Sequence, residues 1–303
     1  MSFVKYTNEQ ELLDIVNILI KSENDKIGDL LYDVLIKSIK YDKSIEICKL
    51  LLQDMRLDIS KDGDYAISYA FELGRIETIK LLLLDSRVDP DREWSLKYAC
   101  EDGHAEIVRS LLKSGKVDPG KPLDSKLYPI YVACYNNQSE VIKILLKDHR
   151  VDPSVNNNEP FRRACGHGHG NVETVKLLLQ DDRVDPSDLN NEAFQNACRG
   201  GNIDVVTILL NDINITPNTD NNQAFQLACK HGHSNIVELL LKDIRIDPSD
   251  SSNMAIRIAA LHGKTKCVEL LLKDKRVNHK DFNDGALKNA IKNKHVDIIK
   301  LLS

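Results

Sequence analysis

Residues 191–212 read NEAFQNACRGGNIDVVTILLND, and the wording returns as NQAFQLACKHGHSNIVELLLKD at 222–243 and NMAIRIAALHGKTKCVELLLKD at 253–274. Each copy starts 31 residues after the one before. A fixed period between about 20 and 50 residues is typical of stacked supersecondary units. Such solenoids present a long surface to a partner. The period therefore predicts a stack of repeats and directs the search for function toward binding.

The residue pattern within each repeat predicts two short helices followed by a turn. The first helix carries Phe194 and Ala197 and ends at Gly201, a residue suited to the left-handed conformation after a helix C-terminus. The second helix has one apolar stripe, made by Val205, Val206, Leu209 and Leu210. Proline in segments such as 183–187 prevents further helix. We therefore predict an all-α solenoid of helical repeats.

The position of the first-helix alanine counts the repeats. That alanine, or its substitute, stands at positions 39, 70, 99, 133, 164, 197, 228, 259 and 290. These positions predict nine repeats after a leading helix that contains residues 15–20. Arrays need atypical ends to close their exposed faces. We expect a divergent N-terminal capping region over 1–60, regular repeats over 61–280 and a C-terminal capping repeat over 281–303.

The motif of each repeat resembles the ankyrin repeat. A small-residue helix is followed by Gly-His, as in Gly103-His104 or Gly232-His233, then by Ile/Val-Val-x-Leu-Leu-Leu and a turn. The resemblance extends from about Ile27 to Leu302. It implies an ankyrin-type solenoid with short turn or hairpin fingers, which binds a partner protein through its concave face. The Thr-Pro-Leu-His of the family is replaced, for example by Glu192-Ala193-Phe194-Gln195.

An asparagine or aspartate recurs one position before the missing threonine. These residues are Asp64, Asn158, Asn191, Asn222, Asn253 and Asp284. Their side chains are suited to accept hydrogen bonds from the free backbone N–H groups at a helix start. We therefore predict that they cap the first helices.

Cysteine occupies a fixed place in the repeat. Five of the 7 cysteines directly follow the helix alanine: Cys100, Cys134, Cys165, Cys198 and Cys229. Stacked helices are about 8–10 Å apart, beyond the roughly 7 Å Cα limit for a disulfide. We expect small buried side chains in a reducing compartment. Cys-x-His-x-His at 165–169 and 229–233 suggests zinc, but the cysteine lies on the predicted buried face. We therefore expect no metal, no redox role and no cofactor.

Asp-x-Arg recurs at the turns. The pairs are Asp54/Arg56, Asp85/Arg87, Asp148/Arg150, Asp181/Arg183, Asp243/Arg245 and Asp274/Arg276. One interpretation is a charged ladder that grips a partner, and the other is an ion pair that stabilises each turn. A partner contact should vary between repeats, so the constancy of the pair favours the turn.

Composition excludes several classes of function. The net charge of −5, from 46 acidic and 41 basic residues, lacks the basic surplus of a nucleic-acid binder. No apolar run could span a bilayer, and the first residues lack a signal-peptide core. No catalytic set or phosphate loop stands out. We expect a non-enzymatic monomer in the cytoplasm, or in a host's cytoplasm or nucleus if the source is an intracellular pathogen or a virus.

The positions that differ between repeats are the candidate binding residues. Aromatic residues concentrate in the two repeats whose loops break the period, and basic residues follow the Ala-Cys pair later in the chain. The candidates are Trp94, Tyr98, Tyr128, Tyr131, Tyr135, Arg199 and Lys230. The other interpretation is that Trp94 and Tyr128 only pack over irregular loops. We expect a protein-interaction scaffold; the alternative is an adaptor that recruits an enzyme through its divergent N-terminal region.

Overall fold

The computed structural model describes most of the chain, namely residues 9–40, 45–89, 95–123, 127–166 and 172–303. Over these residues the regular structure is helical, with nineteen α-helices and one short 3-10 helix and no strand. The all-α prediction is confirmed. Contacts divide the chain into an N-terminal segment (1–132 with 147–151) and a C-terminal segment (133–146 with 152–303).

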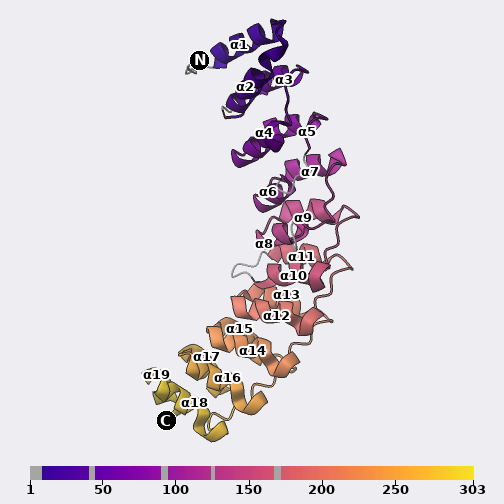
Figure 1. Ribbon diagram of the computed structural model, residues 1–303. Coiled ribbons are helices and arrows are strands. Elements are labelled where there is room, and N and C mark those ends of the chain that lie inside the picture. The colour runs from indigo at the N-terminus through magenta and orange to yellow at the C-terminus, as the bar shows by residue number, and fades with distance from the viewer. Residues whose placement is uncertain (1–8, 41–44, 90–94, 124–126, 167–171) are drawn as a thin grey trace. The chain divides into compact units, whose positions relative to one another are not determined.

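The N-terminal segment consists of helix pairs behind a leading helix. Its helices are α1 (Glu9–Lys21), η1 (Asp25–Ile27), α2 (Gly28–Lys40), α3 (Ile45–Leu52), α4 (Lys61–Glu72), α5 (Ile76–Leu84), α6 (Ser95–Glu101) and α7 (Ala105–Ser114). The first helices α2, α4 and α6 pack on one another in order, and α1, α3, α5 and α7 form a second row beside them (Figure 1). Helix α8 (Pro129–Tyr135) begins in this segment and ends in the next.

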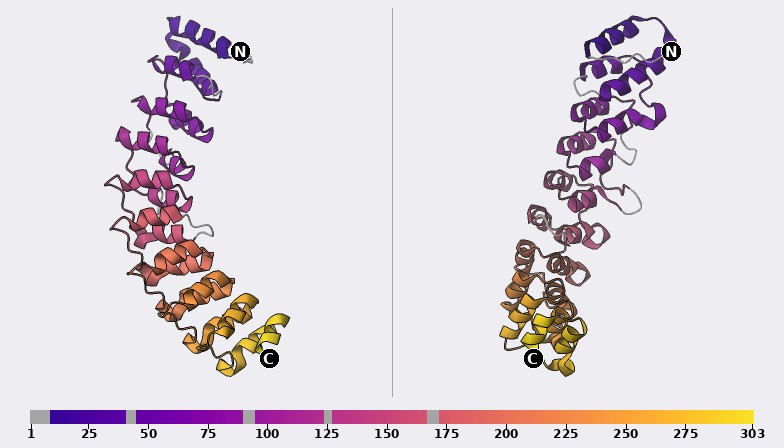
Figure 2. Two further views of the ribbon diagram at one scale, coloured as in Figure 1. Left: turned by 180° about the vertical axis from the view of Figure 1, so that it is seen from behind. Right: turned by 90° about the vertical axis from the view of Figure 1, so that its left-hand side faces the viewer.

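The C-terminal segment repeats this two-row arrangement. Its helices are α9 (Ser139–Leu146), α10 (Val155–Gly166), α11 (Val172–Leu179), α12 (Asp188–Gly200), α13 (Ile203–Leu210), α14 (Thr219–His231), α15 (Ser234–Leu241), α16 (Asp250–Leu261), α17 (Thr265–Lys273), α18 (Asp281–Lys292) and α19 (Val296–Leu302). Even-numbered helices from α10 pack on one another, as do the odd-numbered ones from α9 (Figure 2). Across the described residues, nine pairs follow α1, as predicted.

The core lies between the two rows of helices. Phe194, Ala197 and Cys198 of α12 and Val205 and Leu209 of α13 are all fully buried. Every one of the seven cysteines is a free, buried thiol. The prediction of small buried side chains without disulfides is therefore confirmed.

A single turn of left-handed helix precedes the regular part of five first helices. It occupies residues 156–158, 189–191, 220–222, 251–253 and 282–284. Asn190, for example, has φ 58° and ψ 43°, and the N–H of Asn191 donates to the carbonyl of Ser187 at 2.9 Å. The left-handed conformation costs L-residues about 1–2 kcal/mol each. Asparagine and aspartate tolerate it best, but three in succession require compensation from elsewhere.

The compensation comes from the following repeat. Asn253, the last residue of its left-handed turn, is buried; its Oδ1 accepts from the N–H of Asn278 at 2.8 Å, and its Nδ2 donates to Asp281 Oδ2 at 2.9 Å. Asn158 and Asn191 make the same two kinds of contact with the next repeat.

The predicted helix caps are therefore wrong for these asparagines. In the left-handed conformation the amides of Asn158, Asn191 and Asn253 bind the next turn instead of the N–H groups of their own helix, and the Nδ2 of Asn222 also donates to the next repeat. The side chain of Asp284 is exposed, and that of Asp64 lies outside the described side chains.

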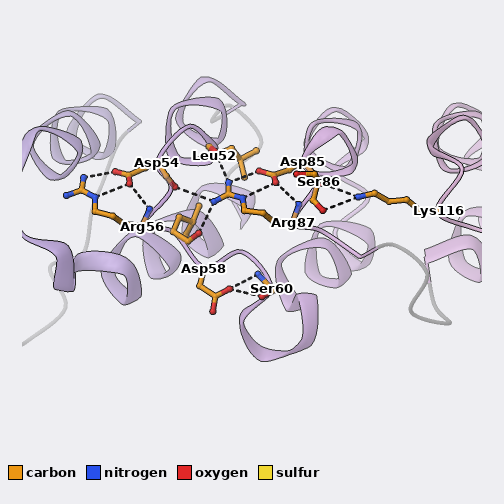
Figure 3. A network of polar contacts seen from close by, with 10 residues as sticks. Leu52, Asp54, Arg56, Asp58, Ser60, Asp85, Ser86, Arg87 and Lys116 are labelled. Atoms are coloured by element: carbon orange, nitrogen blue, oxygen red, sulfur yellow. Dashed lines mark hydrogen bonds and ion pairs between the residues drawn. The ribbon is translucent and has the colours of Figure 1, made fainter.

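The Asp-x-Arg pairs close the turns and also link neighbouring repeats. All six ion pairs are present at 2.6–2.7 Å, which confirms the turn-stabilising interpretation. Arg87 also donates from Nη2 to the carbonyl of Leu52 at 2.7 Å and from Nη1 to that of Leu57 at 2.9 Å (Figure 3). Lys116 takes the arginine position one repeat later and donates to the carbonyl of Val88 at 2.8 Å. We use the name arginine clasp for an Asp-x-Arg ion pair whose arginine also donates to carbonyls of the preceding repeat.

Candidate functional site

The aromatic candidates lie around α6 and α8. Trp94 falls outside the described residues. Tyr98 in α6 is 39% exposed, whereas Tyr128, just before α8, and Tyr131 within it are half-buried. These three tyrosines belong to the N-terminal segment. Tyr135, the last residue of α8, is 44% exposed and belongs to the C-terminal segment.

The two basic candidates occupy equivalent places in consecutive repeats. Arg199 is in the last turn of α12 and Lys230 in the last turn of α14, and both side chains are exposed. Basic residues at a helix C-terminus complement the helix dipole, so their place has a structural reason as well. Arg199 Nη1 donates to Asn196 Oδ1 at 2.9 Å, a neutral partner.

Glycine lets the next repeat approach this part of the surface. Gly201 has φ +83°, as predicted for the residue after the helix, and its N–H donates to the carbonyl of Ala197. A Cβ there would lie 2.5 Å from the His233 ring. His233 Nε2 forms a hydrogen bond of 2.9 Å with the carbonyl of Arg199. The His233 imidazole therefore covers the C-terminal end of α12, in the preceding repeat.

The same approach recurs one repeat later. A Cβ at Gly232 would lie 2.8 Å from Cδ of Lys264, so this lysine crosses the loop beside His231. The rings of His231 and His233 are stacked, with centroids 6.2 Å apart. Side chains from three successive repeats thus meet at the C-terminal ends of α12, α14 and α16.

The electrostatics of these histidines reflect the surrounding cations. Partial burial lowers the pKa of His231, and His233, Lys230, Arg199 and Lys264 lower it further. Partial burial and the charges of Lys230, Lys264 and His295 likewise lower the pKa of His262. The structure therefore brings Arg199 and Lys230 into a larger basic cluster. We did not predict Lys264 as part of it, although its place in the sequence follows Gly263 as His233 follows Gly232.

An open hollow of about 560 Å³ lies at the start of α18, where no site was predicted. It is lined by Arg257, Phe282, Asn283, Gly285, Lys288 and Asn289. The Arg257 guanidinium lies 4.2 Å from the centre of the Phe282 ring, close enough for a cation–π contact. Phe282 is the first residue of a left-handed turn and is 65% exposed. Its hydrophobic side chain would be hard to detect as a surface residue from sequence.

The described residues contain no group of three or more His, Cys, Asp or Glu side chains arranged to hold a metal ion. Cys229 is fully buried while His231 is exposed, and His167 and His169 lie outside the described residues. Burial raises the pKa of thiols such as Cys198 and Cys229, and that of Cys267 to about 11. The described helices include none long and apolar enough to cross a membrane.

Paired helices stacked in two rows and joined by tight turns define a helical-repeat protein. The family model for ankyrin repeats (3 copies) matches residues 96–190 and 163–251, which together span about half of the chain. The chain belongs to the ankyrin-repeat family. No curated protein matches it.

Proposed function

We propose that the chain is a non-enzymatic scaffold that binds a partner protein through the concave face expected of an ankyrin array. Ankyrin repeats are generally protein–protein interaction modules. We also propose that the protein is monomeric and cytoplasmic. The residues that would carry binding are the tyrosines around α6 and α8 and the basic residues that end α12 and α14.

One observation supports this assignment above the others. The recurring polar residues are occupied inside the array: Arg87 binds the preceding repeat and Asn253 the following one. The residues that change from repeat to repeat, such as Tyr98, Tyr135 and Lys230, are exposed. Exposed aromatic and basic residues are enriched among those that dominate binding energy at interfaces.

The test is affinity capture with the full-length chain and two matched variants. Tyr131→Ala/Tyr135→Ala alters the predicted contact on α8. Tyr65→Ala/Tyr69→Ala alters a stacked tyrosine pair with the same spacing on α4, whose rings are 5.4 Å apart. We expect partners identified by mass spectrometry to be lost from the first variant and kept by the second. Capture of no protein by the intact chain would overturn the scaffold function.

The adaptor alternative has one observation in its favour. Ile18 and Met55, in the predicted capping region 1–60, are 69% and 81% exposed. Single exposed apolar residues are normal on a protein surface, and Met55 shares its turn position with exposed Ile213 and Ile244, so Ile18 is the more distinctive of the two. The same capture with Ile18→Ser/Met55→Ser tests it: loss of an enzyme while another partner stays bound would support recruitment through this region.

A further inference from the structure

A group of basic side chains lies at the same end of three successive first helices in the C-terminal segment. We call it the basic row; it comprises Arg199, Lys230, His231, His262, Lys264 and Lys266. All are exposed except Lys264, which is half-buried. They come from the ends of α12, α14 and α16 and from the start of α17.

Contacts between repeats connect Arg199, His231 and Lys264 of the row. His233 lies over Gly201, bonded to the carbonyl of Arg199 and stacked on His231. Lys264 crosses Gly232 in the same way one repeat later. The charges of Lys230 and Lys264 act on both His231 and His262, and that of Arg199 acts on His231, so these basic side chains lie near one another.

Among the residues that the structure describes, nothing acidic neutralises the arginine or the lysines of the row. Over the described residues, no carboxylate forms an ion pair with Arg199, Lys230, Lys264 or Lys266, and the side-chain partner of Arg199 is an amide. The arginines of the clasps differ, since each is paired with its own aspartate. Unpaired like charges repel one another, so their clustering does not help the fold.

The row also interrupts a rule of the repeat. The second residue of the second helix is acidic in most repeats, as in Glu46, Glu77, Glu106, Glu140, Glu173, Asp204 and Asp297. An acidic residue there stabilises the positive end of the helix dipole. In α15 and α17 the position holds Asn235 and Lys266. The lysine opposes the dipole, so local stability does not explain it.

Helix stability accounts for only part of the row. Arg199 and Lys230 end helices, where a positive charge is favourable. Lys264 and Lys266 are at a helix start, where it is not. What all the members share is a place at or beside the turn that joins a first helix to a second helix.

We propose that the basic row binds an acidic segment of the partner protein through ion pairs with aspartate and glutamate side chains. This inference rests on the scaffold function proposed above and names the chemistry of its partner. Complementary charge speeds encounter and excludes basic competitors. Nucleic acid is the less favoured occupant, because the whole chain has a net charge of −5 and would repel an extended phosphate backbone outside the row.

The test uses full-length protein and a fluorescein-labelled peptide of twelve residues, mostly glutamate, with fluorescence anisotropy as the readout. Lys230→Glu/Lys264→Glu reverses two charges of the row. Lys273→Glu/Lys275→Glu makes the same change of net charge at two exposed lysines at the far end of α17 and its turn. Circular dichroism and thermal unfolding show whether both variants keep the fold.

We expect the row variant to bind the peptide at least about tenfold more weakly than wild type at low salt, and the control variant to change by less than about twofold. Equal affinity of both variants, or no binding of the peptide by wild type, would overturn the inference. Tighter binding of a twelve-residue oligouridylate, lost in the same row variant, would overturn the assignment to a protein segment.

The capture experiment separates this inference from the function on which it rests. Partners that bind the row variant and the wild type equally would leave the scaffold function intact and overturn the role of the row. An intact chain that captures no partner would overturn the scaffold function itself, whatever the peptide does.

Discussion

Arg245 donates from Nη2 to the carbonyl of Leu210 at 2.8 Å, across 35 residues of sequence, while the same nitrogen lies 2.7 Å from Asp243 Oδ2. Leu210 is the last residue of α13, where carbonyls have no helical N–H to accept from. One side chain thus closes its own turn and satisfies the end of the preceding helix.

Removal of this clasp should destabilise the protein. Arg245→Ala removes the side-chain donor to the Leu210 carbonyl and to the Asp243 carboxylate, which keeps only its bond from the backbone N–H of residue 245. We expect a loss of about 1–2 kcal/mol in the free energy of unfolding by urea. Lys242→Ala is the control, because this lysine only pairs with exposed Glu238 and should change the value by less than about 0.5 kcal/mol. Similar losses in both variants would contradict the clasp.

The clasps also predict acid sensitivity. Hydrogen bonds from the paired arginines lower the pKa of Asp181 and of the other five clasp aspartates. A carboxylate with a lowered folded pKa stabilises the fold above its unfolded pKa of about 3.9, and this stability is lost as the pH falls through the folded value.

We therefore expect the free energy of unfolding to fall steeply below about pH 4. Asp181→Asn should reduce that fall, whereas Asp182→Asn, at the exposed neighbouring position, should leave it unchanged. Identical pH profiles for the two variants, followed by circular dichroism, would refute this origin of the acid sensitivity.

The turn at residues 212–214 has the aspartate but not the arginine of the clasp, and restoring the arginine should increase stability. Asn214 stands at the arginine position, and its backbone N–H donates to Asp212 Oδ1 at 2.9 Å as in the other turns. Asn214→Arg should pair with Asp212 and reach the carbonyls that end α11, raising the stability by about 0.5–1 kcal/mol. Thermal unfolding measures the gain, and adding Asp212→Ala should abolish it. An unchanged melting temperature would argue against this geometry.

The asparagine links should differ in strength. Asn253 uses both ends of its amide in bonds to the next repeat, whereas Asn222 Oδ1 is buried without a hydrogen-bond partner. Substitution by alanine imposes the same left-handed backbone cost at both positions. We therefore expect Asn253→Ala to lose about 1 kcal/mol more than Asn222→Ala in urea unfolding. The reverse order would contradict the assigned bonds.

The buried thiols should be unreactive toward thiol reagents in the native state. Because only the thiolate reacts, and burial raises the pKa of groups such as Cys198, we expect no reaction with Ellman's reagent before unfolding and all seven thiols to react after it. Ser303→Cys places a thiol at an exposed position and should react at once. Rapid native labelling of a second cysteine in that variant would contradict the packing.

Much of the fold could be predicted because each repeat contains local sequence signals for its helices and for their ends. The apolar stripe of α13 and Gly201 fix where helices lie and end, whatever surrounds them. The role of Asn191 could not be predicted in this way, since asparagine is favoured both as a helix cap and in left-handed backbone. The left-handed conformation of Asn191 is favoured by its bonds with Thr216 and Thr219 of the next repeat. These residues lie outside any local sequence pattern around Asn191.

Part of the candidate site could likewise be predicted from the sequence. Arg199 and Lys230 could be found because they depart from the repeat at an expected surface position. Lys266 departs at the start of a second helix, outside the positions considered, and the approach of Lys264 to Gly232 of the preceding repeat is not visible in the sequence. Spatial grouping of this kind requires the stacked structure.

The left-handed turns have a consequence for synthesis on the ribosome. The partners of Asn191 are made 25 and 28 residues after it. At about 5–20 residues per second, those residues emerge about 1–6 s later. Until then the nascent repeat holds an unfavourable backbone turn without the bonds that offset it. Each repeat of this part of the chain is therefore completed by its successor, and the folded front should trail the growing end by one repeat.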